Sequence, residues 1–140
     1  MDGDAIDRVA AALAAARLAA APVPDLAPNS RPATAAEGYA VQAALARRLT
    51  DAGQGGIAGW KVGATTPGMQ RYLGVDGPAY GRILAANVHA SGAVLPRDAF
   101  CKPGIECEIA VRIGAIAKTE SGAGSWTRDT VAGLVAAVLR

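Results

Sequence analysis

The sequence predicts an α+β fold in which helices come first and short strands follow. Two stretches within the first 56 residues repeat apolar side chains at helical spacing, and capping signals mark their boundaries. Beyond residue 56 the apolar stretches are shorter, and the clearest of them alternates with a period of two, which is typical of a strand. We therefore expect a helical cap over residues 1–56 and a β-rich region with part of a mixed sheet over residues 57–140.

Two helices are predicted in the N-terminal region. The first covers residues 4–21 and ends at Pro22, because proline cannot continue a helix. The second opens at the capping box Thr34-Ala-Ala-Glu37, and Gly53 supplies a left-handed stop after it. Their apolar stripes are Ile6, Val9, Leu13 and Ala16 in the first helix and Val41, Leu45 and Leu49 in the second.

The elements expected after residue 56 are short. A strand over residues 57–62 leads to a helix over residues 69–73, with Thr66 as its N-cap and Gly74 at its end. The remaining expectations are strands over residues 80–84, 88–95 and 105–113, a loop from Gly114 to Gly124, and a helix from Asp129 or Thr130 to residue 140.

The stretch from Ile105 to Ile113 carries the clearest chemical signal. As a strand it places Glu106 and Glu108 on one face, about 7 Å apart at Cα for a rise of about 3.4 Å per residue. Two carboxylates at that spacing repel each other, and a hard divalent cation with oxygen ligands relieves the repulsion. The pattern thus indicates a metal site, although a half-exposed strand with a polar outer face also explains it.

Two further residues are candidates for acid–base or substrate-orienting roles. Lys61 lies within the apolar stretch Gly-Trp-Lys-Val-Gly of a chain whose basic residues are mostly arginine, and a lysine can release its proton where an arginine cannot. An edge-strand lysine that reaches to solvent is the alternative. Asp76 lies in a loop rich in glycine and proline, where a turn-stabilising role is the alternative to a catalytic one.

Composition excludes several classes of protein. With 140 residues the chain is one domain or less, and a net charge of +2 from scattered basic residues indicates neither a nucleic-acid nor a membrane partner. A single histidine, His89, rules out the usual zinc sites, and no G-x-S-x-G motif supports a hydrolase triad. The acidic start is unlike a signal peptide, and no stretch approaches a membrane span, so we expect a cytoplasmic protein.

Five motifs occur along the chain in one order: Tyr39-x-x-Gln42, Gly59-Trp-Lys-Val-Gly63, Met69-Gln70, Leu73-Gly-Val-Asp-Gly-Pro-x-Tyr-Gly81 and Ile105-Glu-x-Glu-Ile-Ala110. In this order they resemble the 2-keto-4-pentenoate (2-hydroxypenta-2,4-dienoate) hydratases of the fumarylacetoacetate hydrolase superfamily. The likeness runs from about residue 5 to the end of the chain, and it covers the N-terminal half of such a protein.

The resemblance implies a fold, a cofactor and a reaction. The fold is the mixed sheet or roll of fumarylacetoacetate hydrolase, and Glu106 and Glu108 match the first two carboxylates of a Mg²⁺ or Mn²⁺ site. Lys61 and Asp76 match active-site positions. The family reaction adds water to a small-molecule 2-hydroxy-dienoate, here 2-hydroxypenta-2,4-dienoate, and gives 4-hydroxy-2-oxopentanoate in aromatic meta-cleavage catabolism.

The chain also departs from the family pattern. Family members are close to twice as long, and their third metal carboxylate follows the point where this sequence stops, so we expect a truncated, incomplete metal-binding catalytic region that is inactive alone. The sister activity, 4-oxalocrotonate decarboxylase, fits the same motifs. A non-catalytic protein that associates with a related full-length subunit is a third possibility, and a homo-oligomer is expected for the enzyme.

Overall fold

The computed structural model describes residues 1–114 and 127–139. It divides into two units, Met1–Pro103 and Gly104–Arg140. Helices and two small antiparallel sheets make up the described residues, which confirms the predicted α+β class. None of the helices in these residues is long and apolar enough to cross a bilayer.

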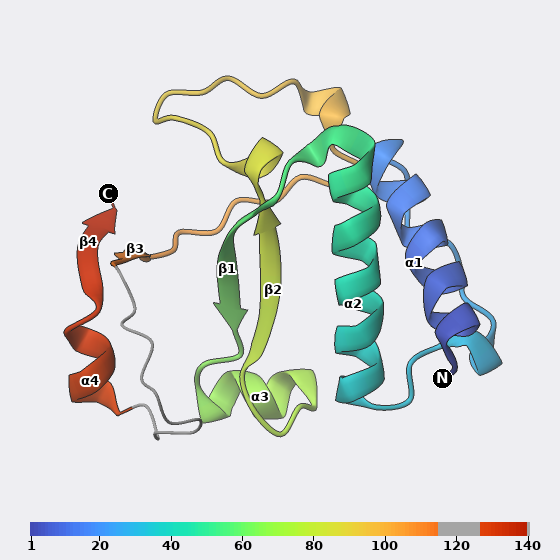
Figure 1. Cartoon of the computed structure of the whole chain (residues 1–140), viewed down its shortest axis with the longest axis horizontal. Coiled ribbons are helices and arrows are strands. Elements are labelled where there is room, and N and C mark those ends of the chain that lie inside the picture. Colours follow the sequence, from blue (N-terminus) through green and yellow to red (C-terminus); the bar gives the residue numbers. More distant parts are fainter. Residues whose placement is uncertain (115–126, 140) are drawn as a thin grey trace. The chain divides into compact units, whose positions relative to one another are not determined.

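Two helices, α1 (Gly3–Leu18) and α2 (Ala35–Leu49), lie side by side and run in the same direction (Figure 1). At one end the Met1 amine pairs with the Glu37 carboxylate, and at the other end Ala14 packs in one cluster with Leu49. A parallel pair requires a long return segment, which the proline-containing residues 19–34 with the short helix η1 (Pro28–Ser30) provide. Both predicted helices are confirmed, but the first ends at Leu18, three residues before the predicted end at residue 21.

Side-chain caps explain where these helices begin. The Asp2 carboxylate accepts a hydrogen bond from the Ala5 N–H (2.7 Å), and the Thr34 hydroxyl accepts one from the Glu37 N–H (3.2 Å). The Glu37 carboxylate accepts in turn from the Ala33 N–H (2.7 Å), one residue earlier than in a standard capping box. The segment η2 (Thr50–Gln54) follows α2, and Gly53 adopts φ 85° within it, as the sequence predicts.

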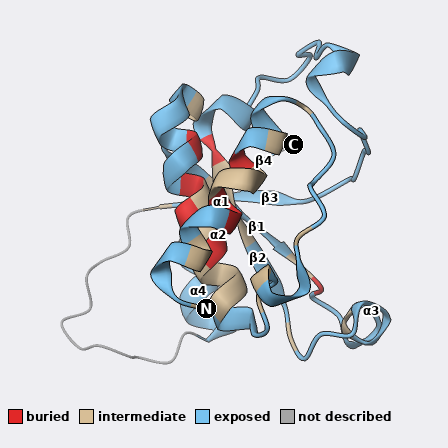
Figure 2. Ribbon diagram, turned by 90° about the vertical axis from the view of Figure 1, so that its right-hand side faces the viewer, coloured by how far each residue is buried: buried red, intermediate tan, exposed pale blue. Residues whose placement is uncertain are grey.

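The core of the first unit is small and rich in alanine. Figure 2 shows most of its buried residues on α1 and α2. None of the larger side chains among the described residues is completely enclosed. Alanine contacts let the helices approach closely but bury little apolar area per residue. The buried residues are Val9, Ala10, Ala14, Val41, Ala44, Ala46, Leu49, Ala64 and Leu84.

A two-stranded antiparallel sheet packs beside α2. Its strands are β1 (Ile57–Gly63) and β2 (Ala79–Leu84), and helix α3 (Pro67–Leu73) connects them (Figure 1). Thr66 caps α3 through its hydroxyl, and Gly74 ends it in the left-handed conformation at φ 68°. These three predicted elements are confirmed.

The strand predicted over residues 88–95 is wrong. The segment follows η3 (Ala85–Asn87) and contains a turn at Gly92, where φ is 83°, before η4 (Arg97–Ala99). No described strand pairs with it, and Val94 is 94% exposed. Alternating apolar residues form a strand only when a neighbouring strand accepts their backbone hydrogen bonds, and the turn prevents that here.

The second unit corrects the prediction for the C-terminal residues. Strand β3 (Ala110–Ile113) pairs antiparallel with β4 (Val135–Leu139), and helix α4 (Arg128–Ala132) precedes β4. The helix expected to run to residue 140 is therefore wrong beyond Ala132. Pairing with β3 outweighs the helical spacing of the apolar residues in 135–139, because strand preference depends on cross-strand packing.

Two further expectations concern this unit. The strand predicted over residues 105–113 is shorter than expected and begins only at Ala110. The Thr127 hydroxyl, rather than Asp129 or Thr130, caps α4. Most of the loop predicted from Gly114 to Gly124 lies outside the described residues.

Candidate functional site

Lys61 lies near the middle of β1, directly opposite Gly81 on β2. Side chains alternate between the two faces of a sheet, so Trp60 and Val62 share one face with their partners Arg82 and Tyr80. Lys61 is on the other face and is exposed.

The face that carries Trp60 is the one that meets α2. We call Tyr39, Gln42, Trp60, Tyr80 and Arg82 the latch cluster. The Gln42 amide donates to the Tyr80 carbonyl (3.0 Å) and its oxygen accepts from the Arg82 guanidinium (2.7 Å). The Tyr80 N–H donates to the Tyr39 hydroxyl (3.3 Å), and the two tyrosine rings stack at 4.2 Å. These bonds fix β2 on α2 and thereby orient both faces of the hairpin.

Two ring contacts complete the latch cluster on the side of β1. The Trp60 ring meets the Tyr80 ring edge-on, with centroids 5.6 Å apart, and the Arg82 guanidinium lies 4.9 Å from the centre of the Trp60 ring. Tyr39 and Gln42 form one of the motifs in the sequence, but the motif alone did not predict this contact. Their spacing of three residues puts both on one side of a helix, which is the signal that could have revealed a shared contact.

Glycines are the neighbours of Lys61 on its face of the hairpin. Gly59 and Gly63 lie two residues away along β1, and Gly81 lies opposite. A methyl group added to any of these glycines would meet nothing within 4 Å. A ligand or another polypeptide can therefore approach the backbone of the hairpin next to Lys61.

Asp76 lies in the loop between α3 and β2 and is exposed. The loop leads into Ala79, which pairs with Gly63 at the end of β1. The Asp76 loop is therefore at the end of the sheet where β1 finishes at Gly63. Lys61 lies two residues before Gly63 on β1. Both residues belong to the first unit.

Glu106 and Glu108 lie in the second unit, in an irregular segment that precedes β3, and both are exposed. The apolar neighbours Ile105 and Ile109 are 97% and 85% exposed. Carboxylate oxygens are the donors that Mg²⁺ and Mn²⁺ prefer, so the two residues fit such an ion in kind. They fall short in number, because the described part of the chain contains no group of three or more His, Cys, Asp or Glu that could hold a metal.

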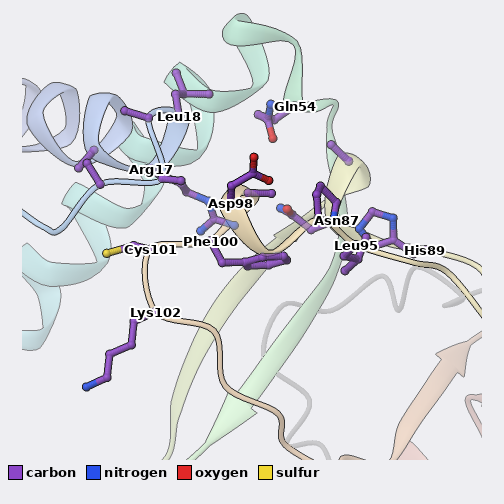
Figure 3. Close-up of a pocket in the computed structure, with 17 residues that line it drawn as sticks. Arg17, Leu18, Gln54, Asn87, His89, Leu95, Asp98, Phe100, Cys101 and Lys102 are labelled. Carbon is purple, nitrogen blue, oxygen red and sulfur yellow. The ribbon is translucent and has the colours of Figure 1, made fainter.

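A cavity of about 760 Å³ lies elsewhere in the first unit, and neither Lys61 nor Asp76 lines it. Figure 3 shows Arg17 beside Asp98, and Gln54 and Asn87 also line the cavity. His89 also lines the cavity and is exposed in an irregular segment. The residues that line the cavity carry both positive and negative charges, so the cavity indicates no particular chemistry.

Part of the chain is similar in sequence to 2-keto-4-pentenoate hydratases, which confirms the predicted resemblance over that part. It is 36% identical over 55 residues to the 2-keto-4-pentenoate hydratase of Burkholderia vietnamiensis, a match that covers 39% of this chain and 21% of the relative. It is 36% identical over 76 residues to the TodF product hydratase of Pseudomonas putida, covering 54% of this chain and 28% of the relative.

A third relative, the 2-keto-4-pentenoate hydratase of Paraburkholderia phymatum, is 33% identical over 55 residues. The matches to these three proteins span between 21% and 28% of the relatives' own length. No family model matches the chain, and no solved structure matches it. The fumarylacetoacetate-hydrolase-like fold therefore stays a prediction.

Proposed function

We propose that the chain contributes Lys61, Asp76, Glu106 and Glu108 to an enzyme that hydrates 2-hydroxypenta-2,4-dienoate to 4-hydroxy-2-oxopentanoate. The observation that carries the proposal is the 33% to 36% identity to proteins named 2-keto-4-pentenoate hydratase and TodF product hydratase. The position of Lys61 beside glycines on an exposed part of the hairpin supports it, because a substrate can approach the backbone there.

The proposed reaction requires protons to move to carbon. The substrate takes up one water molecule, the C2 enol becomes a ketone, and a hydroxyl group is added at C4. Carbons 3 and 5 each receive a proton, while the enol oxygen and the attacking water each lose one. Lys61 suits such transfers, because an ammonium group can give up a proton near neutral pH once its surroundings are less polar. Asp76 is assigned to orient the substrate or the water.

Glu106 and Glu108 are assigned to a divalent cation, Mg²⁺ or Mn²⁺. When bound, such an ion polarises the oxygens of a 2-oxo acid and stabilises negative charge on them. Mg²⁺ requires near-octahedral oxygen coordination, so two carboxylates are too few. We therefore assign the remaining ligands to residues beyond those described or to a second polypeptide of the same family.

A non-catalytic role in association with a related full-length subunit is the second candidate. The observation that favours it is the amount of exposed apolar side chain: Tyr72 is 84% exposed, Leu73 55% and Trp60 51%. Both sheets in the described residues have only two strands, and such hairpins gain stability from further covering elements. A homo-oligomer would cover the same surface.

Product analysis separates the hydratase from its sister activity. The chain is joined to the part of the Pseudomonas putida TodF product hydratase that follows its matched stretch, and each substrate is supplied with Mg²⁺ or Mn²⁺. For the hydratase we expect one oxygen atom from ¹⁸O-labelled water at C4 of the product. Faster release of CO₂ from 4-oxalocrotonate than loss of the dienoate would instead identify the decarboxylase. If the folded joined protein consumes neither substrate, while the separate chain binds the full-length Pseudomonas putida protein, the non-catalytic role is supported.

A further inference from the structure

A cleft of about 350 Å³ lies between the last turns of α2 and the hairpin. Its lining residues on α2 and at the start of η2 recur at spacings of three and four, so they form one side of this continuous helical segment. Two hairpin residues form the opposite wall. The lining consists of Ala43, Ala46, Arg47, Thr50, Asp51, Ile57 and Arg82.

Arg82 is held in a fixed position at this cleft. Its guanidinium donates to the Gln42 side-chain oxygen (2.7 Å) and lies 4.9 Å from the centre of the Trp60 ring. The side chain is only partly exposed. A guanidinium has five N–H donors, and Gln42 receives one hydrogen bond from it among the described residues. An arginine oriented in this way loses little conformational freedom when it binds an anion.

The charge of the cleft favours a single negative charge. Arg47 and Arg82 supply two positive charges and Asp51 one negative charge, and no ion pair among residues 1–114 and 127–139 joins Asp51 to either arginine. Ala43, Ala46 and Ile57 give the cleft an apolar wall, and Ile57 is 51% exposed there. A ligand with one carboxylate and a short hydrocarbon chain matches both features.

We propose that this cleft binds a small organic monocarboxylate, with the carboxylate between Arg47 and Arg82 and the hydrocarbon part against Ile57. Arg82 lies on the α2 side of the hairpin, and Lys61 lies on the opposite face. The site is therefore separate from the one proposed for hydration, and the two proposals can fail independently. A ligand this small, on a partly open site, gives a dissociation constant on the order of millimolar.

Titration of the chain with sodium butyrate, followed by NMR of its backbone amides, tests the proposal. Sodium chloride at the same ionic strength and inorganic phosphate are the comparison titrants. We expect saturable shifts for butyrate at Ala43, Ala46, Thr50 and Ile57, and smaller, non-saturating shifts for chloride. If butyrate causes no saturable shift there, or if phosphate binds more tightly than butyrate, the proposal is wrong.

Variants connect any binding to the two arginines. Arg47→Ala removes an exposed side chain that makes no hydrogen bond or ion pair within the described residues, so the fold should survive. We expect about tenfold weaker butyrate binding, as for the loss of one charge-assisted contact. Arg82→Lys should weaken binding similarly, because it keeps the charge but loses the planar fork. Arg71→Ala on α3 is the matched control, and an equal loss in this variant would overturn the assignment.

Discussion

Lys61 has glycine neighbours on the hairpin face that points away from α2. Replacing it should therefore affect the reaction more than the packing of the hairpin. In the chain joined to the remaining part of a related hydratase, Lys61→Met should lower kcat by about 10² to 10⁴, the usual contribution of a positioned acid or base. Lys61→Arg should lose nearly as much, because arginine keeps the charge but not the transferable proton. Lys102→Met is the control. Turnover within twofold of the parent enzyme in both Lys61 variants would remove Lys61 from the reaction.

Glu106 and Glu108 should act as a pair toward a metal ion. In the same joined enzyme, Glu106→Gln or Glu108→Gln keeps the size of the side chain but removes a charged oxygen ligand. We expect Mn²⁺ affinity to fall at least about tenfold in either variant, measured by electron paramagnetic resonance of free Mn²⁺. Asp98→Asn, which changes a carboxylate at the separate cavity, should leave the affinity unchanged. Unaltered Mn²⁺ binding in both glutamate variants contradicts the assignment.

Glu37 gives the stability of the chain a defined pH dependence. The Met1 amine and the Ala33 N–H both donate to its carboxylate, and they hold its pKa below the ordinary value of 4.5. In the unfolded chain the pKa returns to the ordinary value, so the folded state binds this proton less tightly. The resulting stabilisation is complete above the unfolded pKa and is lost as the pH falls through the folded pKa.

Urea unfolding of the parent chain and of Glu37→Gln should show this effect. The parent should be the more stable of the two near pH 6, and the difference should shrink as the pH falls toward about 3. Asp98→Asn, which changes an exposed carboxylate elsewhere, is the control. A difference between parent and Glu37→Gln that stays constant over this range would show that the carboxylate charge is not responsible.

At the level of elements, the latch cluster supplies hydrogen bonds and ring contacts between α2 and the hairpin. Gln42→Ala removes both hydrogen bonds that the amide makes, to the Tyr80 carbonyl and to Arg82. We expect the free energy of unfolding to fall by about 1–3 kcal/mol, mainly because the partly buried guanidinium of Arg82 loses its hydrogen-bond acceptor. Urea denaturation followed by circular dichroism measures this. Gln54→Ala is the matched control, and an equal loss there would show that the latch cluster has no special role.

The helices of the first unit could be predicted because the residues that begin and end them lie close together in the sequence. Thr34 and Thr66 cap helices through hydrogen bonds to residues three positions away, and Gly74 needs only its own left-handed conformation to end α3. Such signals are complete within a few residues of sequence. The strands β1 and β2 were also predicted, and they lie next to each other as an antiparallel pair.

The elements that were predicted wrongly depend on residues that are distant from them in the sequence. Val135 to Leu139 has apolar residues that suit either a helix or a strand, and its pairing with Ala110 to Ile113 decides for the strand. Residues 88–95 lack a described strand partner and contain the turn at Gly92. For the site, sequence spacing placed Lys61 on β1. The latch cluster was missed because its hydrogen bonds join residues 38 to 41 positions apart.

At the level of the whole molecule, the exposed apolar side chains and the carboxylates lead to the same expectation. Both are expected to be completed by further polypeptide. Val62 is 52% exposed beside Lys61, and Val138 is 62% exposed on β4. The described residues also lack a third carboxylate near Glu106 and Glu108. Relatives that match the chain over 21% to 28% of their length contain much more polypeptide that could supply both the cover and the ligand.

The most direct test is the loss of dienol absorbance when 2-hydroxypenta-2,4-dienoate is added with excess Mg²⁺ or Mn²⁺. Measurements are made on the purified 140-residue chain alone and on the chain joined to the remaining part of a related hydratase. We predict negligible turnover for the chain alone and metal-dependent turnover for the joined protein, abolished by chelation and by Glu106→Ala. Rapid turnover by the chain alone, or none by a folded, metal-loaded joined protein, would contradict the account.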